Sequence, residues 1–334
     1  MWPFLSPLLF RRANHPAVQT PTQGIVPQAE AVEQAWRLGG QLPPLMAENL
    51  PVAVLLPGDQ RAQRLGQGMD FELLRAYQPG EPAQLIDWRI SARTTEPMVR
   101  IFREPAQRQC HIVLDTSATM FFGTRRQLKI TQALTVAHVL TAAALHQNLA
   151  VSVHTPGLPA RPTRHPSTSR AALLDQLHGI EAMLAHPATP QPIDWMGFRQ
   201  RLQGCMAAGQ LLIVIGDFYS DFAEDHSLMG WLPLAQKHRL MLLPVADSAE
   251  RALPDLGTVT FAATPPKRSQ RLDTHDPAIR AELATRFAER QRAIRAFSLA
   301  VGGLSDVIDT TTELTDLLPQ LTELVMTGQG VQAA

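Results

Sequence analysis

The sequence predicts an α/β fold in which a doubly wound, mostly parallel sheet follows a small, partly β subdomain. Two observations predict the sheet: apolar runs such as 210–216 have the length of buried strands, and longer helical stretches separate them. A third predicts the subdomain, because short apolar stretches alternate with Pro/Gly turns before residue 104. We therefore expect an N-terminal region with a small subdomain in 1–104, and the α/β domain in 105–330.

The order of the elements within 105–330 is an alternation of strands and helices. We expect strands at 110–115, 149–154, 210–217, 240–245 and 304–308, and helices at 127–147, 169–185, 194–208, 225–238, 276–299 and 312–327. Such an alternation implies crossover connections and a sheet covered on both faces. Ligands of these folds bind at the carboxyl ends of the strands, so the residues that follow each strand are the candidates for function.

Composition excludes several classes of protein. The 334 residues carry 30 basic and 30 acidic side chains, so no net charge favours nucleic acid or an anionic membrane. The two cysteines make neither a disulfide framework nor a four-ligand zinc site. The apolar segment 1–10 precedes its arginines, which is the reverse of a signal peptide, and no run is long enough to span a bilayer. We expect a cytoplasmic protein without a transmembrane segment or a nucleic-acid partner.

Oxygen-bearing side chains follow two of the expected strands. Asp115, Ser117 and Thr119 alternate after the first strand, where a loop allows a carboxylate and two hydroxyls to converge. Asp217 follows the central strand at the same edge of the sheet. Oxygen ligands of this hardness suit Mg2+ or Mn2+, with water completing the shell. The competing interpretation is a polar turn that only caps a helix, and the second carboxylate favours the metal.

A long ordered series of motifs resembles a bacterial family. The segments are Gly66–Phe71, Arg75–Glu81, Ile86–Arg93, Arg100–Glu104 and Leu114–Met120, followed by Phe122-Gly123. Over roughly residues 55–250, the chain resembles the MoxR-associated von Willebrand factor A-like proteins, the domain of unknown function 58. The resemblance implies a von Willebrand factor A, Rossmann-like sheet. Glu81 stands where that family commonly has Asp, which keeps the charge.

The resemblance also implies a metal-ion-dependent adhesion site and a partner. Asp115, Ser117 and Asp217 match the family pattern, and Thr119 replaces a serine but keeps the hydroxyl. Thr168 is the candidate for the remaining threonine, with Ser167 and Ser169 as alternatives in the same loop. The implied function is non-catalytic: an adaptor or chaperone-like partner of a MoxR-type AAA+ ATPase, with a client protein as a further candidate.

Two other functions stay open. A haloacid-dehalogenase-type phosphohydrolase also uses Mg2+ and an Asp after its first strand, but it needs a second acid where this chain has Ser117. An interaction scaffold with an inactive metal site is compatible with every motif. A P-loop is excluded because none of the lysines, Lys129, Lys237 and Lys267, precedes Ser or Thr.

Aromatic residues beside the motifs allow a surface or a core role. We expect these residues to form the rim of a docking surface, or at least two of them to pack in the core: Phe121, Phe122, Phe218 and Tyr219. For the block 86–93 we expect a structural role in which Trp88 packs and Asp87 pairs with Arg89 or Arg93.

Overall fold

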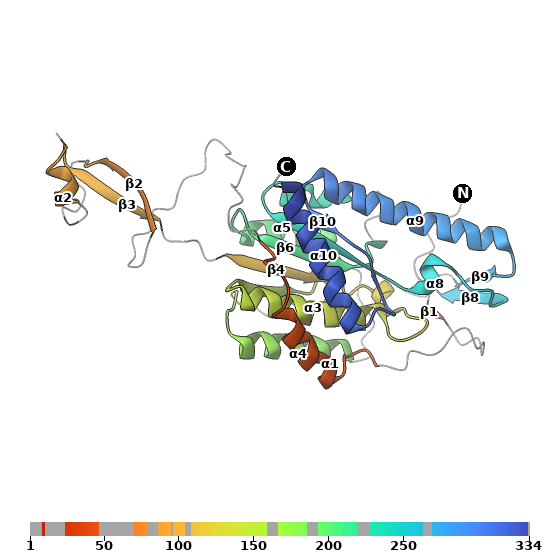
Figure 1. Cartoon of the computed structure of the whole chain (residues 1–334). Coiled ribbons are helices and arrows are strands. Elements are labelled where there is room, and N and C mark those ends of the chain that lie inside the picture. Colours follow the sequence, from red (N-terminus) through yellow and green to blue (C-terminus); the bar gives the residue numbers. More distant parts are fainter. Residues whose placement is uncertain are drawn as a thin grey trace. The chain divides into compact units, whose positions relative to one another are not determined.

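The computed structural model describes residues 9–10, 24–46, 70–78, 84, 86–94, 96–103, 108–158, 166–185, 193–219, 228–262 and 269–332. The chain divides into two compact units, one of residues 55–108 and the other of residues 1–54 together with 109–334 (Figure 1). The larger unit contains most of the expected α/β domain, 105–330, and also the helix α1 (Ala29–Gly39), which precedes the small unit in the chain.

The larger unit is built on a six-stranded sheet whose pairings are all parallel. The strands lie in the order β10-β7-β6-β4-β5, and β11 also pairs with β7. Their bounds are β4 (Gln109–Leu114), β5 (Ala150–His154), β6 (Leu211–Gly216), β7 (Arg239–Ala246), β10 (Leu304–Ser305) and β11 (Ile308–Asp309). The prediction of an α/β fold with a mostly parallel sheet is confirmed, and the expected single strand 304–308 is two short strands.

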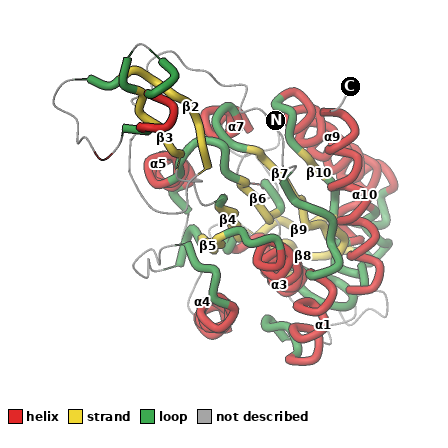
Figure 2. The backbone as a smooth tube through the Cα atoms, turned by 60° about the vertical axis from the view of Figure 1, so that its left-hand side comes forward, coloured by secondary structure: helices red, strands yellow, loops and turns green. Residues whose placement is uncertain are grey.

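Helices cover both faces of this sheet (Figure 2). One face packs against α3 (Lys129–His146), α4 (Arg170–Ala185) and α10 (Leu314–Gln332), and α1 packs in turn on α3 and α10. The other packs against α5 (Trp195–Cys205), η3 (Leu228–Trp231), α7 (Leu232–Ala235) and α9 (Pro277–Ala300). Residues alternate between the two cores along β4: Ile112 and Leu114 face the first, and Val113 faces the second.

The central helix α3 has no polar side because the sheet and other helices surround it. Every residue from Lys129 to Ala144 is buried, which explains its nearly continuous apolar sequence. The helix α1 packs against it, and Trp36 Nε1 donates a hydrogen bond of 3.1 Å to Nδ1 of His138. That contact ties 29–39 to the α/β unit, whereas the sequence pattern placed it in a separate N-terminal region.

Three further elements of the larger unit lie outside the parallel sheet. An antiparallel sheet consists of β1 (Leu9–Phe10), β8 (Thr258–Ala262) and β9 (Ser269–Asp273), and the sequence pattern did not predict the last two. The short helix α8 (Ser248–Arg251) follows β7, and η2 (Ala118–Phe121) follows β4. The expected helix 225–238 is represented by η3 and α7 alone among the described residues, because Pro233 lies in this stretch.

The small unit contains an antiparallel pair, β2 (Asp70–Ala76) and β3 (Met98–Arg103), and the one-turn helix α2 (Trp88–Ser91). Asp87 caps α2 by accepting hydrogen bonds from the backbone N–H groups of Arg89 and Ile90. Trp88 is 66% exposed, so it does not pack as expected. The motif residues 66–69, 79–83 and 104 lie outside the described residues. None of the described helices combines the length and apolar character needed to cross a membrane.

Candidate functional site

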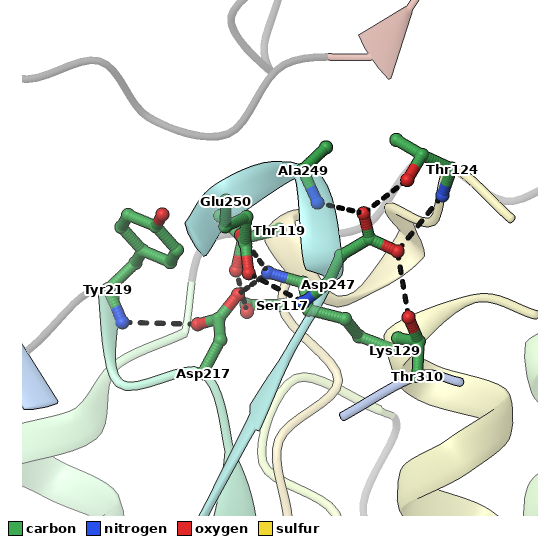
Figure 3. Close-up of polar contacts among 10 residues, drawn as sticks. All are labelled: Ser117, Thr119, Thr124, Lys129, Asp217, Tyr219, Asp247, Ala249, Glu250 and Thr310. Carbon is green, nitrogen blue, oxygen red and sulfur yellow. Dashed lines mark hydrogen bonds and ion pairs between the residues drawn. The ribbon is translucent and has the colours of Figure 1, made fainter. Parts of the chain in front are cut away.

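The loop after β4 brings three of the expected ligands together. Asp115 is buried, and its Oδ1 accepts a 2.8 Å hydrogen bond from the backbone N–H of Ser117. Ser117 Oγ and Thr119 Oγ1 lie 2.8 Å apart, and both side chains are half-buried (Figure 3). The loop therefore holds two half-buried hydroxyl side chains next to a buried carboxylate. The parallel pairing of β4 with β6 continues one residue further, where Asp115 N–H donates to Ile215 O at 2.8 Å.

Asp217 reaches the same edge from β6. Gly216 lets the end of β6 lie close to Asp115, because a Cβ at position 216 would be 2.6 Å from the Cβ of Asp115. A hydrogen bond from Thr119 links the Asp217 carboxylate to the first loop. Phe218, the next residue, has a φ of 57°, which is strained for a bulky side chain. The strained turn directs the Tyr219 N–H back to Asp217 Oδ1 at 3.1 Å.

A buried lysine neutralises Asp217. Lys129 Nζ donates to Asp217 Oδ2 at 2.8 Å and to Glu250 Oε1 at 2.7 Å. The Lys129 side chain has no exposed surface. Burial acts to lower the pKa of Lys129, but the two carboxylates outweigh it and raise the pKa above its ordinary value. Burial likewise acts to raise the pKa of Asp217, and the ammonium reverses that and lowers it. Both groups are therefore charged near neutral pH.

Asp247 is a third strand-end aspartate, at the end of β7. It is fully buried, and its donors are the backbone N–H and hydroxyl of Thr124, the backbone N–H of Ala249 and the hydroxyl of Thr310. It also forms a capping box with Glu250, whose Oε2 accepts from the Asp247 N–H at 3.0 Å. Asp247 thus joins the loop before α3, the helix α8 and the segment after β11.

The structure does not bring Thr168 to this edge. Its neighbour Ser167 pairs with Val151 through two 2.9 Å backbone hydrogen bonds, and Val151 lies level with Cys110 near the start of β4. Asp115 follows the opposite end of β4, five residues beyond Cys110 and thus roughly 16 Å away at about 3.3 Å per residue. The Thr168 side chain is exposed. The loop after β5 contacts the site through Pro156 and not through Thr168. The carbonyl of Pro156 accepts a hydrogen bond from the Thr116 hydroxyl.

The aromatic residues near the site have different roles. Phe218 is buried in the core beneath α5 and α9, and Phe121 packs against the core around α3. The Tyr219 ring has Lys129 Nζ 5.0 Å from its centroid and the Arg290 guanidinium 3.6 Å from it. Burial and Glu250 raise the pKa of the Tyr219 hydroxyl, so it is neutral. Two of the four aromatic residues, Phe121 and Phe218, therefore pack with the core, which is the second of the expected alternatives.

The donor set is compatible with a hard divalent cation. Adjacent ligands of an octahedral Mg2+ lie about 3 Å apart, and the two hydroxyl oxygens are separated by 2.8 Å. Asp115 adds a carboxylate and Asp217 a second one, bonded to Thr119. Among the described residues, no group of three or more His, Cys, Asp or Glu side chains forms a metal cluster. Hydroxyls and water would therefore supply most of the ligands to such a cation.

The sequence interpretation missed Lys129, Asp247 and Glu250. Two signals were available. Asp247 follows the apolar run 240–246, as Asp115 and Asp217 follow theirs, and Asp247-x-x-Glu250 has the pattern of a capping box. Lys129 begins a helix that is apolar on all sides, where a charged side chain requires a buried partner.

Comparisons with known proteins identify relatives without a known role. A family model described as protein of unknown function DUF58 matches residues 73–293. Uncharacterized proteins of Mycobacterium bovis and of two strains of Mycobacterium tuberculosis are 27% identical over 249 residues, which cover 72% of this chain and 74% of each relative. A crystal structure of the conserved hypothetical protein BatB from Bacteroides thetaiotaomicron is 12% identical, with a TM-score of 0.38, and covers 67% of this chain and 99% of that chain. A likeness this weak assigns neither fold nor function.

Proposed function

The chain belongs to the family of proteins of unknown function DUF58, and we propose that it is a non-catalytic protein-interaction module with a von Willebrand factor A-type metal site. In this proposal Asp115, Ser117 and Thr119 bind Mg2+ or Mn2+, and Asp217 acts through Thr119. The open coordination positions accept a carboxylate of a partner. The observation that carries the proposal is the pair of half-buried hydroxyls, 2.8 Å apart, above a buried carboxylate.

The proposed partner is a MoxR-type AAA+ ATPase, as the resemblance in sequence implies. The chain has no P-loop of its own, so any dependence on ATP would come from such a partner. The partial exposure of Ser117 and Thr119 favours an interaction role, because a ligand as large as a protein cannot enter a closed core.

The test compares wild type with Asp115→Ala. Binding of the ATPase encoded in the same genome is measured by biolayer interferometry in Mg2+ and again with a chelator. We expect binding only for wild type in Mg2+, while circular dichroism shows the same fold for both proteins. Thr168→Ala is the matched control, since its hydroxyl lies away from the site. Equal binding by Asp115→Ala, or binding that survives the chelator, contradicts the metal-dependent interaction.

A metal-independent interaction module is the second candidate. It is favoured by Lys129, because a buried ammonium already supplies the positive charge that Asp217 needs. Partner binding that is insensitive to both the chelator and Asp115→Ala would support this candidate.

Lys129 is compatible with the phosphohydrolase, since that class needs a lysine between the Asp after its first strand and its later Gly-Asp motif. Ser117 still lacks the acidity to protonate a leaving group near neutral pH. Turnover of a generic phosphoester that is lost in Asp115→Ala would establish the enzyme and overturn the non-catalytic proposal.

A further inference from the structure

Lys129 competes with any metal for the charge of Asp217. Its ammonium is within hydrogen-bond distance of Asp217 Oδ2, and Thr119 bonds the same carboxylate from the other side. Tyr219 N–H occupies Asp217 Oδ1. Three donors therefore occupy most of the roughly four acceptor sites of this carboxylate, and a cation that ligates Asp217 would have to share its charge with the ammonium.

The ammonium is held in place from a second direction. Glu250 Oε1 lies 2.7 Å from Lys129 Nζ, and Glu250 Oε2 is fixed by the backbone N–H of Asp247. Asp247 is itself buried among four donors. The Glu250 side chain is only 6% exposed, so a move of Lys129 away from both carboxylates would leave the buried charge of Glu250 without its cation.

We propose that Lys129 is a tethered cation that limits the affinity of this edge for a divalent metal, by keeping Asp217 in an ion pair. Lys129 is a positioning residue in this role, and the inference rests on the proposed metal site. Two like charges a few ångströms apart in a poorly hydrated site repel strongly, so a metal at Asp115, Ser117 and Thr119 binds weakly while the ammonium remains. Metal occupancy then depends on the carboxylate that a partner brings.

The experiment measures the dissociation constant of Mg2+ alone by isothermal titration calorimetry. Lys129→Met is expected to bind Mg2+ about ten-fold more tightly than wild type, or tighter still, because it releases Asp217 and removes the competing charge. A merely structural role of Lys129 would weaken binding or leave it unchanged. Lys237→Met is the matched control, since Lys237 is exposed and its loss changes the net charge equally.

A second variant keeps the test decisive if Lys129→Met does not fold. Lys129→Met/Glu250→Gln has the same net charge as wild type, but Asp217 has no ammonium beside it. We expect this double variant also to bind Mg2+ more tightly than wild type. Circular dichroism in chelator establishes which variants are folded before the titrations.

The outcomes separate this inference from the proposed function. Binding by wild type that is lost in Asp115→Ala, with no gain in either Lys129 variant, overturns the inference and leaves the metal site standing. Mg2+ binding by the Lys129 variants alone supports the inference, and partner binding with and without the chelator then decides the proposed function. No Mg2+ binding by any of these proteins overturns the inference.

Discussion

Asp217 and Asp247 follow the neighbouring strands β6 and β7, and both are buried at the carboxyl edge of one sheet. Neutral backbone N–H groups and hydroxyls surround Asp247, whereas Asp217 faces a buried ammonium and a half-exposed hydroxyl loop. Asp247 holds three segments together, and Asp217 contacts the half-buried hydroxyl loop of the candidate site. A carboxylate that follows a parallel strand is thus a candidate ligand. The groups that donate hydrogen bonds to it decide whether it has a structural role, as Asp247 does, or belongs to a binding site.

The largest expected effect comes from removing the carboxylate of Asp247. Asp247→Ala leaves the buried N–H groups of Thr124 and Ala249 without an acceptor, at about 1–3 kcal/mol each. We expect it to lower the free energy of unfolding by about 3 kcal/mol in urea titrations. Asp115→Ala serves for comparison and is expected to lose metal binding with a smaller loss of stability. An equal loss of stability in the two variants would contradict the distinction between a structural Asp247 and a metal-binding Asp115.

A milder change tests the same corner. Thr310→Val removes one hydroxyl that donates to Asp247 Oδ2 at 2.8 Å and preserves the shape of the side chain. We expect a loss of about 1.5 kcal/mol in the free energy of unfolding, typical of one hydrogen bond to a charged group. Mg2+ affinity, measured by calorimetry, should not change. A change in Mg2+ affinity would mean that Asp247 and its hydrogen-bond partners belong to the metal site.

The opposite end of β7 predicts a response to acid. His238 precedes β7, and burial, with the nearby His111 and Lys237, lowers its pKa to about 4. A histidine whose pKa is lowered on folding stabilises the protein fully above its unfolded pKa of 6.5, and this stability is lost as the pH falls towards 4. His238→Leu should therefore reduce the loss of stability between pH 7 and pH 5, by on the order of 1 kcal/mol after allowance for partial hydration of the ring.

Urea titrations of wild type and His238→Leu at several pH values measure this effect. His154 is expected to contribute in the same direction, because burial and His111 lower its pKa to about 3. An unchanged pH profile in His238→Leu would show that His238 is hydrated or paired when the protein is in solution.

The smallest expected effect concerns Thr168. Because it is exposed and lies level with the beginning of β4, Thr168→Ala should change neither Mg2+ affinity nor the free energy of unfolding by more than about 0.5 kcal/mol. A clear loss of Mg2+ binding in this variant would mean that its loop reaches the carboxyl edge when metal is present.

Much of the sheet was predictable because its signals are local. The strand 210–217 and the helix 127–147 were each expected within two residues of β6 and α3, since a buried parallel strand and a surrounded helix both read as continuous apolar runs. The strands β8 and β9 were not predicted, because each is only five residues long and neither is a continuous apolar run. The fold of α1 onto α3 depends on contacts between residues about a hundred positions apart, such as Trp36 and His138.

The sequence by itself determined that Asp115, Ser117, Thr119 and Asp217 meet at one edge, because parallel strands align their carboxyl ends and each of these residues follows a strand. Only the tertiary structure decided what surrounds them. Loop direction separates Thr168 from the site, and packing of α3 under the edge places Lys129 against Asp217 and Glu250. The positions of strands along the chain follow from local patterns of hydrophobicity, whereas the partner of a buried charge is selected by the three-dimensional approach of distant segments.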